Sequence, residues 1–302
     1  MKPKWIVSHR VFDSAQAMIS LKKAIFYQGG QVLLEDPYVT RDITKIIDRG
    51  EWAGAFVYGP FQFYRAVTKH LGGDVALPMD IDKLKYSETV DRMPFGYAFN
   101  ETKIYTTWGA FTEYSVNYEK TEGRRLKYST TGFPGWDVGK WSRSTDLDWA
   151  IYDVFVRSDS VTKTLPGQVI TPCDHEFRAL EDVTNVTDDT PIVVCPGKPY
   201  PYMEERWVVI DNKVVSRSTY LKRGQLHTHN LDSSPLYTGK NSREVFTEIL
   251  ASHMGDMPYT IDVARNDNCT LLLEVNSLQC AGWYECNVEK IVRAVNKAAF
   301  GV

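Results

Sequence analysis

Two segments near the C-terminal end of the chain decide the fold: residues 258–264 read PYTIDVA and residues 271–277 read LLLEVNS. Each is an apolar run of strand length, and the two carry Asp262, then Glu274 and Asn276. Because residues i and i+2 of a strand point to the same face, Glu274 and Asn276 present two oxygen ligands side by side. Asp262 can add a third ligand from the neighbouring strand.

Oxygen-only ligands of this kind are typical of a Mg²⁺ site. Carboxylates at the ends of apolar strands are costly to bury unless a cation or hydrogen-bond donors compensate their charge. The alternative is that the two acids cap nearby helices or pair with arginine. We predict the metal site, with Asp262, Glu274 and Asn276 as its ligands.

The pairing register of the two strands decides whether Asp262 and Glu274 share a face. A tight two-residue turn would point Asp262 away from Glu274. A three-residue loop, Asn266–Asn268, would instead pair Asp262 with Leu272 and place it diagonal to Glu274, within reach of a shared metal ion. We therefore predict an odd loop or a β-bulge between the two carboxylates.

An Asp on one strand and Glu-x-Asn on the next resembles the magnesium motif of the ATP-grasp ligases. The resemblance covers roughly residues 150–302 and is closest to the branch called the R2K clade, through FVRSDSVTKTLPG at 155–167 and the hairpin EERWVVIDNKVV at 204–215. It implies the fold class, which is α/β and α+β: an N-terminal parallel α/β domain followed by a two-lobed ATP-grasp fold that grips Mg-ATP.

The same resemblance implies roles for residues upstream of the metal motif. Arg157 matches the strand-end cation that holds the ATP phosphates, and Lys163 lies in the phosphate loop. Val194 and Cys195 fall at the hinge that offers backbone groups to the adenine. The alternatives are a surface salt bridge for Arg157 and a solvated loop lysine for Lys163.

The chain departs from many ATP-grasp ligases at Thr260, where those relatives carry an arginine two residues before the metal Asp. The hairpin offers a replacement, because a two-residue turn at Asp211-Asn212 would place Arg206 opposite Arg217. We predict that these two arginines clamp a phosphate; the alternative is that they splay into solvent or pair with Glu. Glu205, on the other face, either accepts a ribose hydroxyl or pairs with Lys.

The first 75 residues alternate short apolar runs with helical patterns and predict a parallel β-α-β-α-β unit. We expect three domains: an N-terminal α/β domain at 1–125, an ATP-grasp small lobe with the phosphate loop at 126–198, and a C-terminal lobe with the metal site at 199–302. Further strands are expected at 150–156, 168–171, 191–194, 207–210 and 213–218, and helices after Asn241 and Asn287.

The composition argues against a nucleic-acid-binding, membrane-spanning or secreted protein. Lys and Arg number 35 against 38 Asp and Glu, and the formal charge of −3 gives no basic field for a nucleic-acid backbone. No apolar run approaches the roughly 18 residues of a membrane helix, and the start of the chain lacks a secretory signal. Five widely spaced cysteines suit a reducing compartment. We expect a cytoplasmic protein, and the resemblance to a clade common in phages and bacteria fits a phage protein acting in the host cytoplasm.

The resemblance implies ATP- and Mg²⁺-dependent carboxylate-amine ligation through an acyl phosphate. The expected partners are a small-molecule or peptide carboxylate and an amine acceptor, with a nucleic-acid acceptor left open and no membrane partner. Two alternatives are a nucleotide-binding module without ligase activity and a phosphotransferase acting on a hydroxyl. The identity of the substrates, the role of the N-terminal domain and the oligomeric state are not encoded in any motif of the sequence.

Overall fold

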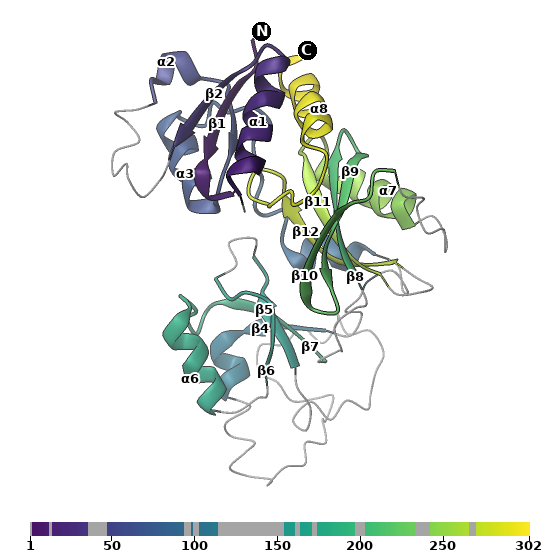
Figure 1. Ribbon diagram of the computed structural model, residues 1–302. Coiled ribbons are helices and arrows are strands. Elements are labelled where there is room, and N and C mark those ends of the chain that lie inside the picture. Colours follow the sequence, from purple (N-terminus) through teal and green to yellow (C-terminus); the bar gives the residue numbers. More distant parts are fainter. Residues whose placement is uncertain are drawn as a thin grey trace. The chain divides into compact units, whose positions relative to one another are not determined.

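The computed structural model describes residues 2–11, 14–35, 47–93, 98, 103–113, 154–160, 164–170, 174–196, 203–233, 242–265 and 270–302. The chain forms two compact units, the first made of residues 1–83 with 201–302 and the second of residues 84–200 (Figure 1). The expected domain boundaries near 125 and 198 lie outside the described residues. No helix in the described part of the chain is long and apolar enough to span a bilayer.

The first unit opens with the predicted parallel sheet, whose strand order is β2-β1-β3. Ser14 caps the first long helix by accepting a hydrogen bond from the backbone N–H of Ala17 at 3.1 Å. The expected helix at 42–49 lies mostly outside the described residues. The elements of this part are β1 (Lys4–Ser8), η1 (His9–Val11), α1 (Ala15–Tyr27), β2 (Gln31–Glu35), α2 (Arg49–Trp52), β3 (Phe56–Tyr58) and α3 (Phe61–His70).

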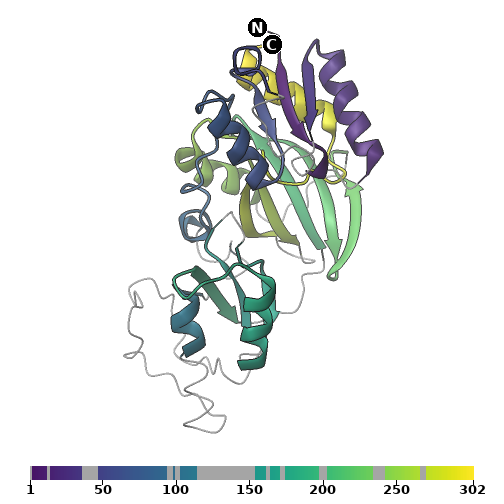
Figure 2. The same ribbon diagram turned by 90° about the vertical axis from the view of Figure 1, so that its left-hand side faces the viewer.

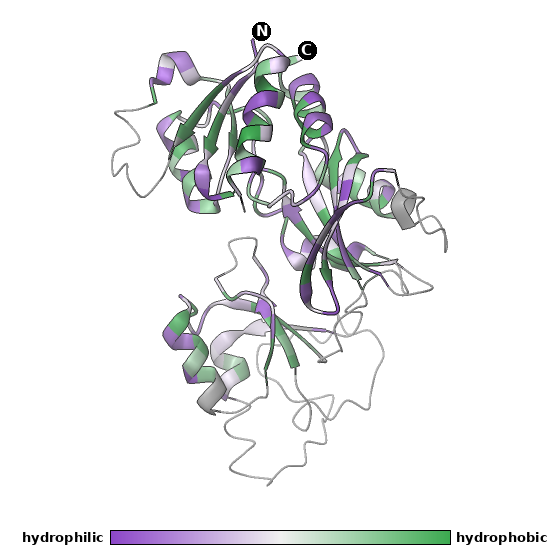
Figure 3. Ribbon diagram, in the orientation of Figure 1, coloured by the Kyte–Doolittle hydropathy of each residue, from purple (hydrophilic) through white to green (hydrophobic). Residues whose placement is uncertain are grey.

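Both faces of this sheet are covered, as a parallel sheet requires. One face packs on α3. The other packs on α1 and on the last helix of the chain, α8 (Val288–Phe300), and these two helices lie side by side (Figures 1 and 2). The hydropathy colouring shows apolar strands under helices whose outer faces are hydrophilic (Figure 3). Asn287 caps α8 and Gly301 ends it at a φ of 72°, as predicted.

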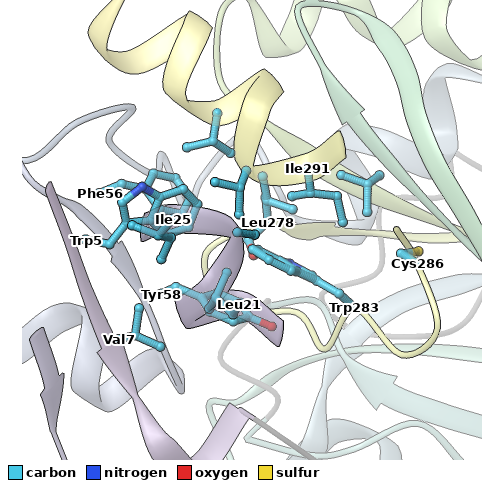
Figure 4. Close-up of a cluster of buried hydrophobic side chains, with 14 of the residues drawn as sticks. Trp5, Val7, Leu21, Ile25, Phe56, Tyr58, Leu278, Trp283, Cys286 and Ile291 are labelled. Carbon is cyan, nitrogen blue, oxygen red and sulfur yellow. The ribbon is translucent and has the colours of Figure 1, made fainter. Parts of the chain in front are cut away.

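The core between α8 and the first sheet is rich in aromatic rings (Figure 4). Trp5 lies against Phe56 with ring centroids 4.7 Å apart, and Tyr58 stacks on Trp283 at 4.3 Å. Trp283 belongs to the segment that follows the metal-motif strand. That segment is also joined to the end of β3, because the backbone N–H of Gly59 donates to the carbonyl of Gln279 at 2.9 Å.

The second sheet of this unit is antiparallel, with the order β10-β9-β8-β11-β12. Asp211 and Asn212 have φ values of 50° and 56°, which confirms the predicted two-residue turn. The strands are β8 (Met203–Ile210), β9 (Lys213–Lys222), β10 (Gln225–Asn230), β11 (Tyr259–Arg265) and β12 (Thr270–Ser277), and α7 (Ser242–Met254) covers one face through Phe246 on Trp207. The loop at 266–269 lies outside the described residues.

The second unit holds an antiparallel sheet of order β4-β7-β5-β6. Its apolar core includes Trp108, Phe177 and Ile192. Neither α6 nor β4 is predicted from the sequence, because both are short and carry many polar residues. The elements are α4 (Tyr86–Thr89), η3 (Val90–Arg92), β4 (Ile104–Thr107), β5 (Val154–Ser158), β6 (Gln168–Ile170), α6 (Asp174–Val183) and β7 (Pro191–Pro196).

Candidate active site

A β-bulge brings the two carboxylates of the metal motif together. Asp262 pairs directly with Glu274, whereas the next residue, Val263, pairs with Leu272, so Leu273 is the extra residue of the bulge. The predicted bulge is confirmed. The predicted pairing of Asp262 with Leu272 is wrong, because Leu272 pairs with Val263 and the extra residue Leu273 then brings Glu274 opposite Asp262.

Asn276 lies between the two carboxylates. Its side-chain Nδ2 donates to Glu274 Oε1 at 2.8 Å and to Asp262 Oδ2 at 3.2 Å. Asp262 is completely buried, whereas Glu274 is half-buried. The structure therefore places all three sequence-predicted metal ligands in one cluster on the strands β11 and β12.

Arg206 of the adjacent strand β8 pairs in register with Asp262 and forms a bidentate ion pair with it. Its Nε lies 2.7 Å from Asp262 Oδ1 and its Nη2 lies 2.6 Å from Oδ2. Nη1 donates to the carbonyl of Gly282 at 2.8 Å. The guanidinium group has five N–H groups, and two of them have no partner in the described part of the chain.

Two tyrosines and a third carboxylate complete the surroundings of Arg206. Its Cζ lies 5.4 Å from the ring centroid of Tyr220 and 5.0 Å from that of Tyr284. The hydroxyl of Tyr220 donates to Glu204 Oε2. Burial raises the pKa of the Glu204 carboxyl, and the charges of Asp262 and Glu274 raise it further.

The donor set fits Mg²⁺ in chemistry and charge. Carboxylates directly opposite each other on neighbouring strands repel, and Arg206 is the cation bonded to Asp262 within the cluster. Complete burial raises the pKa of the Asp262 carboxyl, and the charge of Arg206 opposes that rise. No group of three or more His, Cys, Asp or Glu within the described ranges is placed to hold a metal ion, so the site depends on two carboxylates and one amide.

The predicted clamp of two arginines is wrong. A bulge at Val215 shifts the β8–β9 register, so Arg206 pairs with Ser218 and Arg217 pairs with Trp207. Successive residues of a strand point to opposite faces, and the two guanidinium groups therefore lie on opposite faces of the sheet.

Glu205 shares the face of Arg217 and is bonded by protein groups. Its Oε2 accepts from Trp207 Nε1 at 2.9 Å and lies 4.0 Å from Arg217 Nη1, and its Oε1 accepts from Arg265 Nη1 at 3.0 Å. Only 2% of Glu205 is exposed, so the structure favours an ion pair over a contact with ribose. The cations of that ion pair are arginines and not the expected lysine.

The second unit carries the remaining predicted residues. Arg157 is buried at the end of β5, with its Cζ 5.0 Å from the ring centroid of Tyr86. Val194 and Cys195 lie on β7, where they pair in register with Val156 and Phe155 of β5. The side chains of Val194 and Cys195 are buried. Lys163 lies outside the described residues.

Sequence reasoning missed several neighbours of these residues. Glu204 could have been found from its spacing of two residues before Arg206, but Tyr220 and Tyr284 carry no local signal beyond a tyrosine-rich composition. In the second unit, Asp159 accepts hydrogen bonds from the backbone N–H of Ser87 at 2.8 Å and from its hydroxyl at 2.6 Å. Such contacts join segments that are far apart in the sequence.

Comparison with protein families identifies the C-terminal half of the chain. The model of the ATP-grasp domain, R2K clade family 2, matches residues 138–294, which is more than half of the 302 residues. No curated protein matches the sequence.

Solved structures share the fold over almost the whole chain. D-cycloserine synthetase DcsG is 13% identical with a TM-score of 0.58, and the match covers 98% of this chain and 99% of that one. D-alanine–D-alanine ligase from Bacillus anthracis, complexed with ATP, is 11% identical with a TM-score of 0.51 and coverages of 100% and 98%. The ATP-grasp ligase PsnB with a minimal precursor is 9% identical, with a TM-score of 0.51 and coverages of 98% and 99%. The predicted fold class is confirmed.

Proposed function

Since this chain belongs to the ATP-grasp domain, R2K clade family 2, we propose that it is an ATP- and Mg²⁺-dependent ligase that joins a carboxylate to an amine through an acyl phosphate. The observation that carries the proposal is the direct pairing of Asp262 with Glu274, with Asn276 bonded to both. Two carboxylates opposed on one face of a sheet repel each other, and Arg206 offsets one of the two charges, so the cluster is suited to binding a divalent cation.

Asp262, Glu274 and Asn276 would hold Mg²⁺, which supplies charge neutralisation for the phosphates of ATP. Arg206 contributes a permanent positive charge beside the cluster, in the place of the arginine that Thr260 replaces. Its two remaining N–H groups are available to a phosphate oxygen, while the other three keep it fixed on Asp262 and Gly282. Such fixed charge favours the transfer of a phosphoryl group to a carboxylate.

In the second unit, Arg157 is the residue that we propose for a phosphate contact, because a buried guanidinium group over an aromatic ring is already positioned at a strand end. Lys163 is proposed as a second phosphate ligand on sequence grounds alone. For the backbone of Val194 and Cys195 we keep the proposal of an adenine contact. We propose no nucleotide contact for Glu205 or Arg217.

The substrates that we propose are a small-molecule or peptide carboxylate and an amine. DcsG is a D-cycloserine synthetase and PsnB is a ligase that was solved with a minimal precursor, so a small molecule and a precursor are the two substrate classes to be tested.

The test is an isotope experiment. The purified protein is incubated with Mg-ATP and pools of ¹⁸O-labelled amino acids or short peptides, with and without added amines, and the released phosphate is analysed by mass spectrometry. An acyl phosphate transfers one ¹⁸O from the carboxylate to phosphate when the amine displaces it.

The control is Glu274→Ala, which should abolish the labelled phosphate. A phosphate ester product without free phosphate would instead identify a phosphotransferase. Nucleotide binding without any acceptor-dependent ADP, across both pools, would refute ligation and identify a binding module.

A further inference from the structure

We propose that Tyr220 and Tyr284 are positioning residues, which hold the guanidinium group of Arg206 against Asp262 and thereby fix the orientation of a metal-binding carboxylate. The inference rests on the proposed function of the cluster as a metal site. It concerns two side chains that contact Arg206 and to which the proposed reaction assigns no bond to the metal ion or a substrate.

The geometry of the pair carries the first step. The two rings are stacked, with centroids 5.0 Å apart and planes at 9°, although Tyr220 lies on β9 and Tyr284 lies in the segment after β12. The Arg206 guanidinium lies over both rings, where the electron-rich faces attract a cation. Three separate segments of the first unit therefore meet at this one group.

The second step concerns what the contact fixes. Gly282, whose carbonyl accepts from Arg206 Nη1, lies two residues before Tyr284, so one short segment supplies both a hydrogen bond and a ring. The hydroxyl of Tyr220 is bonded to Glu204, which precedes Arg206 by two residues on β8. The guanidinium group thus contacts two rings and one carbonyl while its Nε and Nη2 atoms bond Asp262. Groups that orient a ligand in this way strongly affect metal affinity.

The backbone of Tyr284 provides an independent observation. Its φ is 48°, in the left-handed region that glycine adopts freely and that a residue with a large side chain adopts at a cost. A glycine there would remove the backbone strain. The chain instead carries an aromatic ring at this position, and that ring stacks on Tyr220 and lies against Arg206. Strain kept at a site of this kind indicates a role of the side chain.

The test separates the effect of the aromatic ring on metal binding from the effect of the backbone strain at Tyr284. Tyr284→Gly removes the ring and relieves the strain, Tyr284→Phe keeps the ring, and Tyr220→Leu and Tyr220→Phe are the matching pair on β9. Binding of Mn²⁺, with competition by Mg²⁺, is followed by electron paramagnetic resonance. We expect the Gly and Leu variants to bind Mn²⁺ about tenfold or more weakly and the two Phe variants to stay within about twofold of the wild type.

A second readout needs no metal. In ¹⁵N-arginine-labelled protein treated with EDTA, the Nε–H of Arg206 should exchange slowly with water because it is buried in the bond to Asp262. We expect that protection to fall in Tyr284→Gly and to persist in Tyr284→Phe. The control is Tyr27→Ala on α1, which removes a tyrosine that is 77% exposed and should change neither measurement.

The outcomes distinguish the two proposals. Positioning is supported if the Gly and Leu variants bind Mn²⁺ more weakly and lose the protection of the Arg206 Nε–H. The unfolding temperature of Tyr284→Gly in EDTA should at the same time be at or above the wild-type value. Wild-type affinity and protection in those variants would overturn the positioning role and leave the metal site intact. A wild-type protein that binds no Mn²⁺ would refute the metal site and, with it, this inference.

Discussion

At the scale of single residues, the ion pair between Arg206 and Asp262 decides how the cluster behaves. Asp262 is completely buried and 5% of Arg206 is exposed, so each group depends on the other for compensation of its charge. Arginine suits this position because its planar fork donates to both carboxylate oxygens at once, which lysine cannot do. The same pair that stabilises the fold thus presents the proposed metal ligand.

This pair makes a stability prediction. Arg206→Ala should lower the free energy of unfolding by about 3–5 kcal/mol, because it leaves a buried carboxylate without its cation. Arg206→Lys should recover part of the loss. In the double variant Arg206→Ala/Asp262→Ala the loss should be smaller than the sum of the two single losses, as measured by urea denaturation. Strict additivity of the two substitutions would show that the groups are not coupled.

At the scale of secondary structure, two bulges decide which residues share a face. If Leu273 paired with Asp262 instead of forming a bulge, the register near the loop would continue and place Glu274 opposite Ile261, on the face away from Asp262. The bulge at Val215 acts in the opposite sense, because it separates two arginines that a regular hairpin would pair. Bulges are thus the elements that assemble the cluster.

The register of β11 and β12 predicts how two single-residue deletions affect metal binding. Removing Leu273 should convert β11–β12 into a regular ladder in which Asp262 still pairs with Glu274, so Mn²⁺ binding should persist within about tenfold. Removing Val275 instead makes Glu274 and Asn276 consecutive, which sends their side chains to opposite faces, and binding should be lost. Circular dichroism checks that both variants fold. Equal binding by both would refute the assignment of the ligands to one face.

At the scale of the whole first unit, the two ends of the chain share one core. Ile291, Val292 and Val295 of α8 are buried against the sheet that begins at residue 4. Polar contacts follow the same pattern, since Trp5 Nε1 donates to Asn296 Oδ1 at 2.9 Å. The N-terminal sheet therefore cannot complete its core until the last helix is present.

A truncation tests this dependence. A chain that ends at residue 287 should lose the packing of the N-terminal sheet, because one face of that sheet loses an apolar cover. We expect loss of the near-ultraviolet circular dichroism of the buried tryptophans and rapid proteolysis within residues 1–83. Replacing only the exposed Val302 by Ala is the control and should change neither. A protected N-terminal segment in the truncated chain would show that this part folds by itself.

Sequence periodicity was sufficient for the elements whose signals are local. The parallel strands and the helices α1 and α3 of the first 75 residues, the caps Ser14 and Asn287 and the turn at Asp211-Asn212 all follow from the preferences of neighbouring residues, and the structure confirms them. The helix expected at 42–49 lies mostly outside the described residues. The motif Asp262 with Glu274 and Asn276 also indicated the family, because its spacing on two strands is a local property of the chain.

Tertiary structure decided everything that depends on contacts across strands. No local pattern shows that Val215 and Leu273 are extra residues of bulges, since a bulge is defined by the partner strand. The partners of the Arg206 side chain come from three separate segments: Asp262 on β11, Tyr220 on β9, and Gly282 with Tyr284 after β12. Glu205 bonds Trp207 and Arg265, where the sequence left a ribose hydroxyl open as a partner. The sequence by itself determined which ligands and charges the site contains; only the folded sheet, through its register and bulges, decided which of them face one another.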